Sequence, residues 1–247
     1  MQIDILTLFP EMFKGPLSES LIKKACEKGL LSINLVNLRD FATDKHKTAD
    51  DSPYGGGAGM VMKVDVISAA INKLKNSNTR LPTHNAQRII YMCPTGKTLT
   101  QQKVKELSKY EHLTILCGHY EGIDERARTL IDEEVSIGDY VLTGGELPAM
   151  VLIDAVARYI PGVVKEEASV EMDSFSAGLL DYPSYTRPED FNGKKVPDAL
   201  LSGHHADIAT WRRKESLNNT FYKRPDLLAA AELDENDRKL LGEIISE

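Results

Sequence analysis

Two short stretches of the chain place glycines and polar side chains directly after apolar runs, an arrangement that suits a ligand pocket. The first is residues 118–122 (GHYEG), which follow the apolar run 113–117. The second is residues 136–148 (SIGDYVLTGGELP), in which glycines interrupt and close two short apolar runs. Glycines at such points are typical of backbone that bends sharply or lies close to a bound molecule. If the preceding runs are strands, both turns lie at the carboxyl ends of a sheet, where open α/β folds bind ligands; for either stretch alone, a plain tight turn is the alternative.

Two further glycine-containing segments fail the phosphate-binding motifs that they resemble at first sight. Gly-Lys-Thr at residues 96–98 follows an apolar run, but Tyr91 stands where a phosphate loop requires glycine. The cluster at residues 53–59 (PYGGGAG) lacks the third glycine of a dinucleotide-binding fingerprint, because Met60 and Met62 occupy those places. The second cluster lies in a long loop and is interpreted as a phosphate nest, a hinge or a flexible lid.

The clearest group of basic residues lies towards the C-terminus. Clustered cations with interleaved aromatic side chains suit contact with an RNA backbone and exposed bases. The alternative is a solvated helix face, and the formal net charge of -7 argues against a general basic field around the chain. The residues of this group are Arg212, Arg213, Lys214, Lys223 and Arg224, next to His204, His205, Trp211 and Tyr222.

The candidate residues need a scaffold, and the apolar pattern of the chain predicts one. Strand-like runs alternate with helical segments, which is typical of a mostly parallel sheet with helices on both faces, an α/β fold. We expect strands at residues 2–8, 31–38, 88–92 and 113–117, and helices at residues 17–28, 64–75, 100–109 and 146–160. From residue 196 onward the pattern predicts short helices without a strand, which indicates a small all-α domain.

The composition, 42% hydrophobic and 27% charged among 247 residues, is that of an ordinary soluble globular protein. We predict an α/β domain at residues 1–162, an interdomain linker or lid at 163–185 and a helical domain at 186–247. No apolar run approaches the length of a membrane span, so we expect no membrane partner. The three cysteines lie far apart in the sequence, which indicates reduced thiols in the cytoplasm and neither disulfides nor a zinc site.

Taken together, these motifs resemble the bacterial tRNA (guanine-N1)-methyltransferases, which belong to the SPOUT class of methyltransferases. The resemblance extends in order over essentially the whole chain. One departure is His119, where many relatives carry arginine. The matching segments are residues 8–10 (LFP), 44–47 (DKHK), 53–57 (PYGGG), 118–126 (GHYEGIDER), 136–148, 173–175 (DSF), 185–188 (YTRP) and 202–205 (SGHH).

The resemblance implies more than the apolar pattern does. It implies a deep trefoil knot in the α/β domain, with S-adenosyl-L-methionine (AdoMet) bound in a bent conformation within the knot. It also implies a homodimer whose active site lies between the subunits, and catalysis that depends on Mg²⁺. The implied reaction is methylation of N1 of the guanosine just 3′ of the anticodon, at position 37 of tRNA, with the anticodon stem-loop as the partner.

The chemistry of that reaction assigns roles to charged residues. Guanine N1 carries a proton, so a carboxylate base is required, and negative charge then grows on the neighbouring O6, where a cation or donor is needed. By resemblance, Asp173 is the base and Arg158 stabilises the negative charge that develops on O6. Glu121 is expected to accept from the amino edge of the guanine. Taken singly, these residues are a loop acid, a helix-end cation and a surface acid.

The resemblance also implies the binding residues. We expect tRNA contacts from Arg212, Arg213, Lys214, His204, His205, Lys47 and Tyr54. No residue is assigned to Mg²⁺. The residues expected to bind AdoMet are Tyr91, Met92, Pro94, Gly118, Tyr120, Ser136, Ile137, Gly138, Asp139, Tyr140, Val141, Leu142, Gly144, Gly145 and Pro148.

Two alternatives of different classes stay open. One is a methyltransferase of the same fold that acts on another RNA, such as rRNA. The other is a non-enzymatic RNA-binding protein, which would bind tRNA without binding AdoMet. Methyl transfer to tRNA and rRNA transcripts separates the first alternative from the main prediction, and AdoMet titration separates the second.

Overall fold

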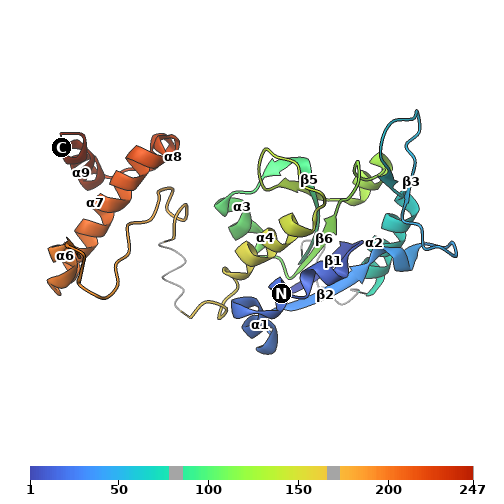
Figure 1. Ribbon diagram of the computed structural model, residues 1–247, viewed down its shortest axis with the longest axis horizontal. Coiled ribbons are helices and arrows are strands. Elements are labelled where there is room, and N and C mark those ends of the chain that lie inside the picture. Colours follow the sequence, from blue (N-terminus) through green and yellow to red (C-terminus); the bar gives the residue numbers. More distant parts are fainter. Residues whose placement is uncertain (78–85, 166–172, 247) are drawn as a thin grey trace. The chain divides into compact units, whose positions relative to one another are not determined.

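The computed structural model describes residues 1–77, 86–165 and 173–246. The chain divides into two compact units, Met1–Lys165 and Glu166–Glu247, which are called the N-terminal and C-terminal units below (Figure 1). Part of the predicted linker, residues 166–172, lies outside the described residues. The described remainder of that linker, residues 173–185, belongs to the C-terminal unit.

The N-terminal unit is built on a five-stranded sheet with the strand order β2-β1-β6-β5-β7. All of its pairings are parallel, which confirms the predicted parallel α/β arrangement. In the register of the three central strands, Ile5 of β1 and Ile90 of β5 both lie opposite Ile115 of β6. The strands are β1 (Gln2–Thr7), β2 (Ser32–Asn37), β5 (Gln87–Thr98), β6 (His112–Cys117) and β7 (Glu133–Ser136).

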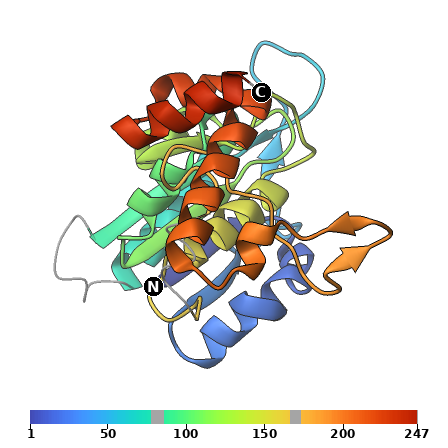
Figure 2. The same cartoon turned by 90° about the vertical axis from the view of Figure 1, so that its left-hand side faces the viewer.

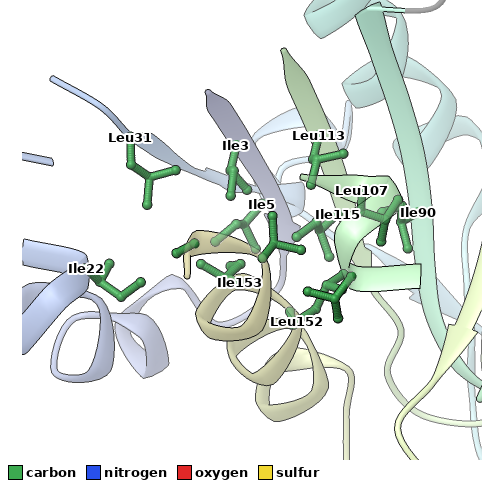
Figure 3. Packing of buried hydrophobic residues seen from close by; sticks show 14 of the residues in the cluster. Ile3, Ile5, Ile22, Leu31, Ile90, Leu107, Leu113, Ile115, Leu152 and Ile153 are labelled. Carbon is green, nitrogen blue, oxygen red and sulfur yellow. The ribbon is translucent and has the colours of Figure 1, made fainter. Parts of the chain in front are cut away.

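Helices cover both faces of this sheet, as the alternating pattern predicts. On one face, α1 (Ser20–Glu27), α3 (Gln101–Leu107) and α4 (Glu146–Ala157) enclose a core with Ile3, Ile5 and Ile115. Figure 3 shows Leu152 and Ile153 of α4 directed at these strand residues, and both side chains are fully buried. On the other face, α2 (Val64–Ser77) and the short 3-10 helices η3 (Leu38–Phe41) and η5 (Glu125–Leu130) cover a second core.

Two features of the sheet region differ from the predicted elements. Strand β5 continues well beyond the predicted end at residue 92, because its register shifts between Met92 and Lys97 and the later residues then pair again with β7. The long loop of residues 39–60 also contains a short strand, β3 (Asp50–Asp51), which pairs antiparallel with β4 (Val61–Met62) directly after the loop. Neither feature has a local apolar period, since both depend on partner strands distant in sequence.

The C-terminal unit has its own hydrophobic core, formed by Leu179 with residues of two packed helices, α7 and α9. The prediction of a purely helical segment is wrong at one place, a two-stranded hairpin of β8 (Asp190–Phe191) and β9 (Lys194–Lys195). Asn192 and Gly193 form its turn with positive φ values of 55° and 81°, the backbone that tight hairpins favour. Figure 2 shows the hairpin extending away from the helices of this unit. These helices are α6 (Asp198–Leu201), α7 (His205–Lys223), α8 (Pro225–Ala230) and α9 (Glu235–Ser246).

No helix in the described ranges has the length and apolar character needed to cross a membrane.

Candidate functional site

A cavity of about 450 Å³ lies in the N-terminal unit, where β5, β6 and β7 end. Both glycine-bearing turns line it, together with residues 91–95 of the bulged part of β5. The carboxyl ends of parallel strands are the usual ligand position in α/β sheets, and the volume falls within the range of small-molecule sites. The structure thus brings together three stretches that are distant in sequence.

The two turns approach each other closely at Gly118 and Gly145. The backbone N–H of Gly145 donates to the carbonyl of Gly118 over 2.7 Å, and His119 forms a further backbone bridge to Gly144. A Cβ at Gly145 would lie 2.8 Å from both the Cα of Cys117 and the nitrogen of Gly118, which is closer than real side chains come. The glycine is therefore required by close packing of backbone against backbone.

The turn after β7 is closed by hydrogen bonds of the Ser136 side chain. Ser136 Oγ accepts from the N–H of Gly138 over 3.2 Å and lies 3.0 Å from its carbonyl. Gly138 has a φ of 151°, so the chain turns here and does not continue as a strand. As a result, Tyr140 and Val141 are 55% and 83% exposed beside the cavity. Large apolar side chains held in solvent at a cavity rim mark a place where a ligand or partner binds.

The turn after β6 holds Glu121 at the cavity. Tyr120 adopts a positive φ of 59°, which is uncommon for a residue other than glycine and typical of functional turns. The N–H of Glu121 donates to the carbonyl of Met60 over 3.0 Å, and the N–H of Met62 donates to the carbonyl of Gly122 over the same distance. The end of the glycine-rich loop is thereby attached to the segment that carries Glu121.

His119 occupies an aromatic cluster at this turn. Its ring lies 4.8 Å from the ring of Phe9 and 4.9 Å from that of Tyr120, measured between centroids. Its Nδ1 is buried and has no hydrogen-bond partner among the described residues. The His119 side chain is thus held by packing between aromatic rings.

A polar network that the sequence did not reveal joins three residues of the cavity wall, Cys93, Thr95 and Arg128, to Glu134, which is not part of the lining. Glu134 accepts from Arg128, from the Cys93 thiol over 3.4 Å and from the Thr95 hydroxyl over 3.1 Å. Burial alone would raise the pKa of Glu134, but these hydrogen bonds outweigh it and lower the pKa. The Arg128 guanidinium lies 5.7 Å above the ring of Tyr91, whose pKa burial raises to about 12. The wall is therefore a fixed set of charges and neutral donors at neutral pH.

Most of the residues expected to bind the cofactor line this cavity. The exception is Asp139, which is exposed and does not contribute to the lining. Glu121, expected to contact the guanine, also lines it. Sequence reasoning missed Thr95, Glu125 and Arg128, whereas Cys93 lies within the segment 91–94 whose backbone was expected to hold the cofactor. Thr95 is signalled only once β5 is known to continue past residue 92, and no sequence signal indicated Arg128.

The two charged residues expected to act on the guanine lie elsewhere. Arg158 caps the C-terminal end of α4, whereas Gly145 at its N-terminal end lies at the cavity. A helix of 12 residues separates its ends by roughly 18 Å, so Arg158 does not join the cavity of its own chain. Asp173 belongs to the C-terminal unit.

The C-terminal unit contains a second cavity, of about 280 Å³. Asp173 lines it together with Asp181, Tyr182, Arg212 and Arg213. The remainder of the wall is mainly apolar, and its residues are Ala177, Leu179, Leu180, Ala209 and Ser216.

The three consecutive basic residues of α7 have different surroundings. Arg213 forms a two-pronged ion pair with the buried Asp237 of α9, with contacts of 2.7 and 2.6 Å. Lys214 Nζ lies 3.5 Å from a carboxylate oxygen of Glu243, which is also in α9. Arg212 lies face-on over Tyr182, with its Cζ 4.8 Å from the ring centroid. The structure therefore does not present these residues as one uniform basic surface.

The other expected RNA contacts are exposed. His204 and His205 lie at the start of α7. In the N-terminal unit, Lys47 pairs with Asp40 over 2.8 Å at the surface, and Tyr54 is fully exposed in the glycine-rich loop.

The described residues offer a place for one of the two expected cofactors, AdoMet, but indicate none for the other, Mg²⁺. The cavity of the N-terminal unit has a volume in the range of small-molecule sites, and glycines let the two turns that line it approach closely, so it fits a ligand such as AdoMet. By contrast, no cluster of His, Cys, Asp or Glu that could hold a metal ion occurs within residues 1–77, 86–165 and 173–246. The described residues therefore point to no particular position for Mg²⁺.

Comparison with known proteins gives a consistent result. The family model described as tRNA (Guanine-1)-methyltransferase TrmD matches residues 1–230. A tRNA (guanine-N(1)-)-methyltransferase of Syntrophomonas wolfei is 55% identical over 245 residues, which cover 99% of this chain and 97% of that protein. Proteins of the same name from Citrifermentans bemidjiense and Halalkalibacterium halodurans are each 54% identical over 245 residues, covering 99% of this chain and 96% and 98% of their own lengths.

Proposed function

The chain belongs to the tRNA (guanine-1)-methyltransferase family, and on that premise we propose that it methylates N1 of guanosine 37, just 3′ of the anticodon, in tRNA. The methyl donor is AdoMet. The observation that carries the proposal is the cavity at the carboxyl ends of β5, β6 and β7, because it is lined by the same turns that carry the family resemblance.

We propose that AdoMet binds in this cavity, in a knotted segment of the chain. Bound AdoMet supplies an electrophilic methyl group. Backbone groups of Gly118, residues 137–142 and Gly144 are proposed to hold the adenine and ribose, since both turns line the cavity. The exposed Tyr140 and Val141 exclude water from the bound cofactor.

Asp173 is proposed to remove the N1 proton of the guanine. The turn that carries it is well ordered by hydrogen bonds: the N–H of Ser176 donates to the Asp173 carbonyl over 3.1 Å, and the N–H of Phe175 donates to the carbonyl of Leu179 over 2.7 Å. These bonds hold the backbone that carries the Asp173 carboxylate, and a general base must lie within hydrogen-bond reach of the proton that it removes. Glu121 is proposed to accept from the amino edge of the guanine.

Arg158 is proposed to stabilise the negative charge that grows on O6. Within one chain Arg158 lies at the end of α4 opposite the cavity, roughly 18 Å away along the helix. This separation supports a homodimer in which the active site lies between two subunits. We further propose that the C-terminal unit supplies tRNA contacts and that the enzyme acts in the cytoplasm. No step is assigned to Mg²⁺.

The test is single-turnover methylation of an unmodified tRNA transcript by the wild-type chain and by Asp173→Asn. The substitution keeps the size of the side chain and removes the base, so we expect AdoMet and tRNA binding to persist while the rate falls by about a hundredfold or more. A wild-type rate in Asp173→Asn would remove Asp173 from this role.

Two controls define the reaction. A transcript with adenosine at position 37 should remain unmethylated, which checks the site. An rRNA transcript should also remain unmethylated, and methylation of it in preference to tRNA would overturn the proposed substrate. Absence of AdoMet binding in a calorimetric titration would overturn the proposed enzyme altogether.

A further inference from the structure

The side chain of Glu146 is a buried carboxylate that no step of the proposed reaction uses. Only 1% of the residue is exposed. Its Oε1 accepts from the Thr7 hydroxyl over 2.8 Å, and the same hydroxyl accepts from the N–H of Phe9 over 2.9 Å. Within the described part of the chain, Glu146 forms no ion pair with a lysine or arginine. A buried charge without a cation costs free energy, so a cationic ligand nearby lowers that cost.

The Glu146 carboxylate lies directly behind the wall of the cavity in the N-terminal unit. Gly144 lines that cavity, and the position that a Cβ of Gly144 would occupy lies 2.4 Å from Glu146 Oε2. Burial raises the pKa of the Cys117 thiol well above its usual range, and the neighbouring Glu146 charge adds to this rise. Glu146 is also the first residue of α4, where the helix dipole stabilises an ionised carboxylate. A negative charge is therefore held beside the turn that is proposed to bind the cofactor.

The charged groups around this cavity are mostly negative. Glu121 and Glu125 line it as carboxylates, and Arg128 lines it as a cation. The Arg128 guanidinium is already paired with Glu134 and, over 2.9 Å, with Glu125. Together with Glu146, the described residues thus place four carboxylates and one guanidinium in the wall or directly behind it. Such a cavity favours a positively charged ligand.

Burial decides which of these charges acts most strongly on a ligand. Glu121 and Glu125 are exposed, so water and salt screen their charges. Glu134 is paired with the Arg128 guanidinium. Glu146 is buried and has no paired cation, and a charge in that setting is screened much less. We therefore expect Glu146 to contribute the largest share of the field that a bound ligand meets.

The methyl donor and its product differ in charge at one atom. AdoMet carries a positive sulfonium, whereas the product S-adenosylhomocysteine (AdoHcy) has a neutral thioether. In the transfer, the bond between sulfur and the methyl carbon breaks with its electron pair left on sulfur, and the carbon bonds to guanine N1 as the N1 proton passes to the base. The adenine, the ribose and the amino-acid part stay the same, so a nearby buried charge distinguishes donor from product by the charge on sulfur.

We propose that Glu146 is a specificity-determining residue for the cofactor, because its buried carboxylate favours the sulfonium of AdoMet over the thioether of AdoHcy. The same preference favours exchange of the product for a new donor after each turnover. This inference rests on the proposed function and deepens it. It requires no contact between Glu146 and the sulfur, since a charge in a weakly screened setting acts over a distance.

The test is calorimetric titration of the wild type and of Glu146→Gln with AdoMet and with AdoHcy. Glutamine keeps the shape of the side chain and an oxygen that accepts from Thr7, but it carries no charge. We expect Glu146→Gln to weaken AdoMet binding by about tenfold, the effect of one unit charge at roughly 10 Å for an effective dielectric constant of about 20. Binding of AdoHcy should change by less than about twofold, because its sulfur is neutral.

Two controls isolate the buried charge. Asp154→Asn removes a carboxylate from an exposed position of the same helix, so the ratio of the two affinities should stay within about twofold of the wild-type ratio. The second control needs no variant, because raising the salt concentration from about 0.1 M to 1 M shortens the screening length from about 10 Å to 3 Å. The affinity ratio of the wild type should stay nearly constant in this series, since a buried charge is screened little by salt.

The outcomes are distinguishable. Equal weakening of both ligands in Glu146→Gln would leave Glu146 a structural role only and overturn the inference, and so would an unchanged affinity for AdoMet. A wild-type ratio that falls about tenfold at high salt would assign the discrimination to the exposed carboxylates and overturn the inference as well. Circular dichroism establishes whether Glu146→Gln is folded, and the salt series decides the question if it is not. Absence of AdoMet binding by the wild type would instead overturn the proposed function.

Discussion

At the scale of single residues, the cavity in the N-terminal unit depends on glycines, which have no side chain and so let two turns come close together. Gly145 brings the turn before α4 into contact with the backbone at the end of β6, and its N–H donates to the carbonyl of Gly118. Any Cβ at this position meets main-chain atoms, which cannot rotate away as a flexible side chain would. Geometry at this one position therefore controls how close the two turns lie.

Gly145→Ala should weaken AdoMet binding and also destabilise the fold. The added methyl group must displace backbone, and overpacking of this kind costs about 1–3 kcal/mol. Calorimetric titration with AdoMet and urea unfolding measure the two effects. Gly15→Ala is the control, because nothing lies within 4 Å of a Cβ there, and it should behave as the wild type. Unchanged AdoMet affinity in Gly145→Ala would exclude this turn from the binding site.

At the scale of elements, α4 connects the cavity to the core. It begins beside the cavity, and its central turns contribute Leu152, Ile153 and Val156 to the core against the sheet. Since both ends of the helix carry proposed functional residues, its packing sets their positions. Loss of core contacts along α4 should therefore lower the free energy of unfolding directly and weaken AdoMet binding only through the shift of the helix.

Ile153→Ala should lower the free energy of unfolding of the N-terminal unit by about 2–5 kcal/mol, because it removes a fully buried side chain and leaves a cavity. Val151→Ala on the same helix is the control, since Val151 is 48% exposed and should change stability little. Urea unfolding followed by circular dichroism measures both. Equal effects of the two substitutions would contradict the packing described for α4.

In the C-terminal unit, the pairing of α7 with α9 depends on the ion pair of Arg213 with Asp237. The hydrogen bond from Arg213 lowers the pKa of Asp237, so the ionised carboxylate stabilises the folded state. This stability is complete above the unfolded-state pKa of an aspartate, about 3.9, and is lost as the pH falls through the lower pKa of the folded state.

Asp237→Asn should therefore be less stable than the wild type at neutral pH, and its stability should fall less steeply below about pH 4. Fluorescence of Trp211, the single tryptophan of the chain, reports unfolding of this unit in urea across a pH series. Asp226→Asn is the control: its pair with Arg224 is exposed at the surface, where ion pairs contribute little. Parallel acid profiles for the wild type and Asp237→Asn would contradict the stabilising role of the pair.

At the scale of the whole molecule, the two units have separate hydrophobic cores. The cores on both faces of the sheet contain only residues of the N-terminal unit, and the core around Leu217 contains only residues of the C-terminal unit. The cavity proposed to bind AdoMet is likewise lined, within the described part of the chain, by residues of the N-terminal unit. The residues proposed to act on the guanine come from both units, since Glu121 and Arg158 belong to the N-terminal unit and Asp173 to the C-terminal unit.

A chain that ends at Lys165 should fold and bind AdoMet with the affinity of the full chain, yet fail to methylate tRNA. It retains every residue of the cavity and lacks both Asp173 and Arg212. Calorimetry and a methylation assay with the full chain as reference test this expectation. Loss of AdoMet binding in the shortened chain would mean that the N-terminal unit does not hold the cavity by itself.

The sequence by itself determined many of the elements and the family. Strands such as β1 and β6 and helices such as α2 follow from local apolar periods, and glycines identified the two turns because a bend without a side chain is a local property. The order of motifs along the chain was enough to indicate the methyltransferase family, because such motifs are matched by residue type and spacing alone.

The tertiary structure decided which residues each charged side chain contacts and which strand pairs with each strand end. Arg212 and Arg213 are adjacent and chemically identical, yet one stacks on Tyr182 beside a cavity and the other is bound to Asp237 of another helix. In the same way, β5 continues past its bulge only because β7 pairs with it, and Arg128 of η5 contributes to the cavity wall where its guanidinium lies over the ring of Tyr91. Local periodicity reports the preference of a segment for helix or strand, whereas the partner of a side chain depends on contacts between residues far apart in the sequence.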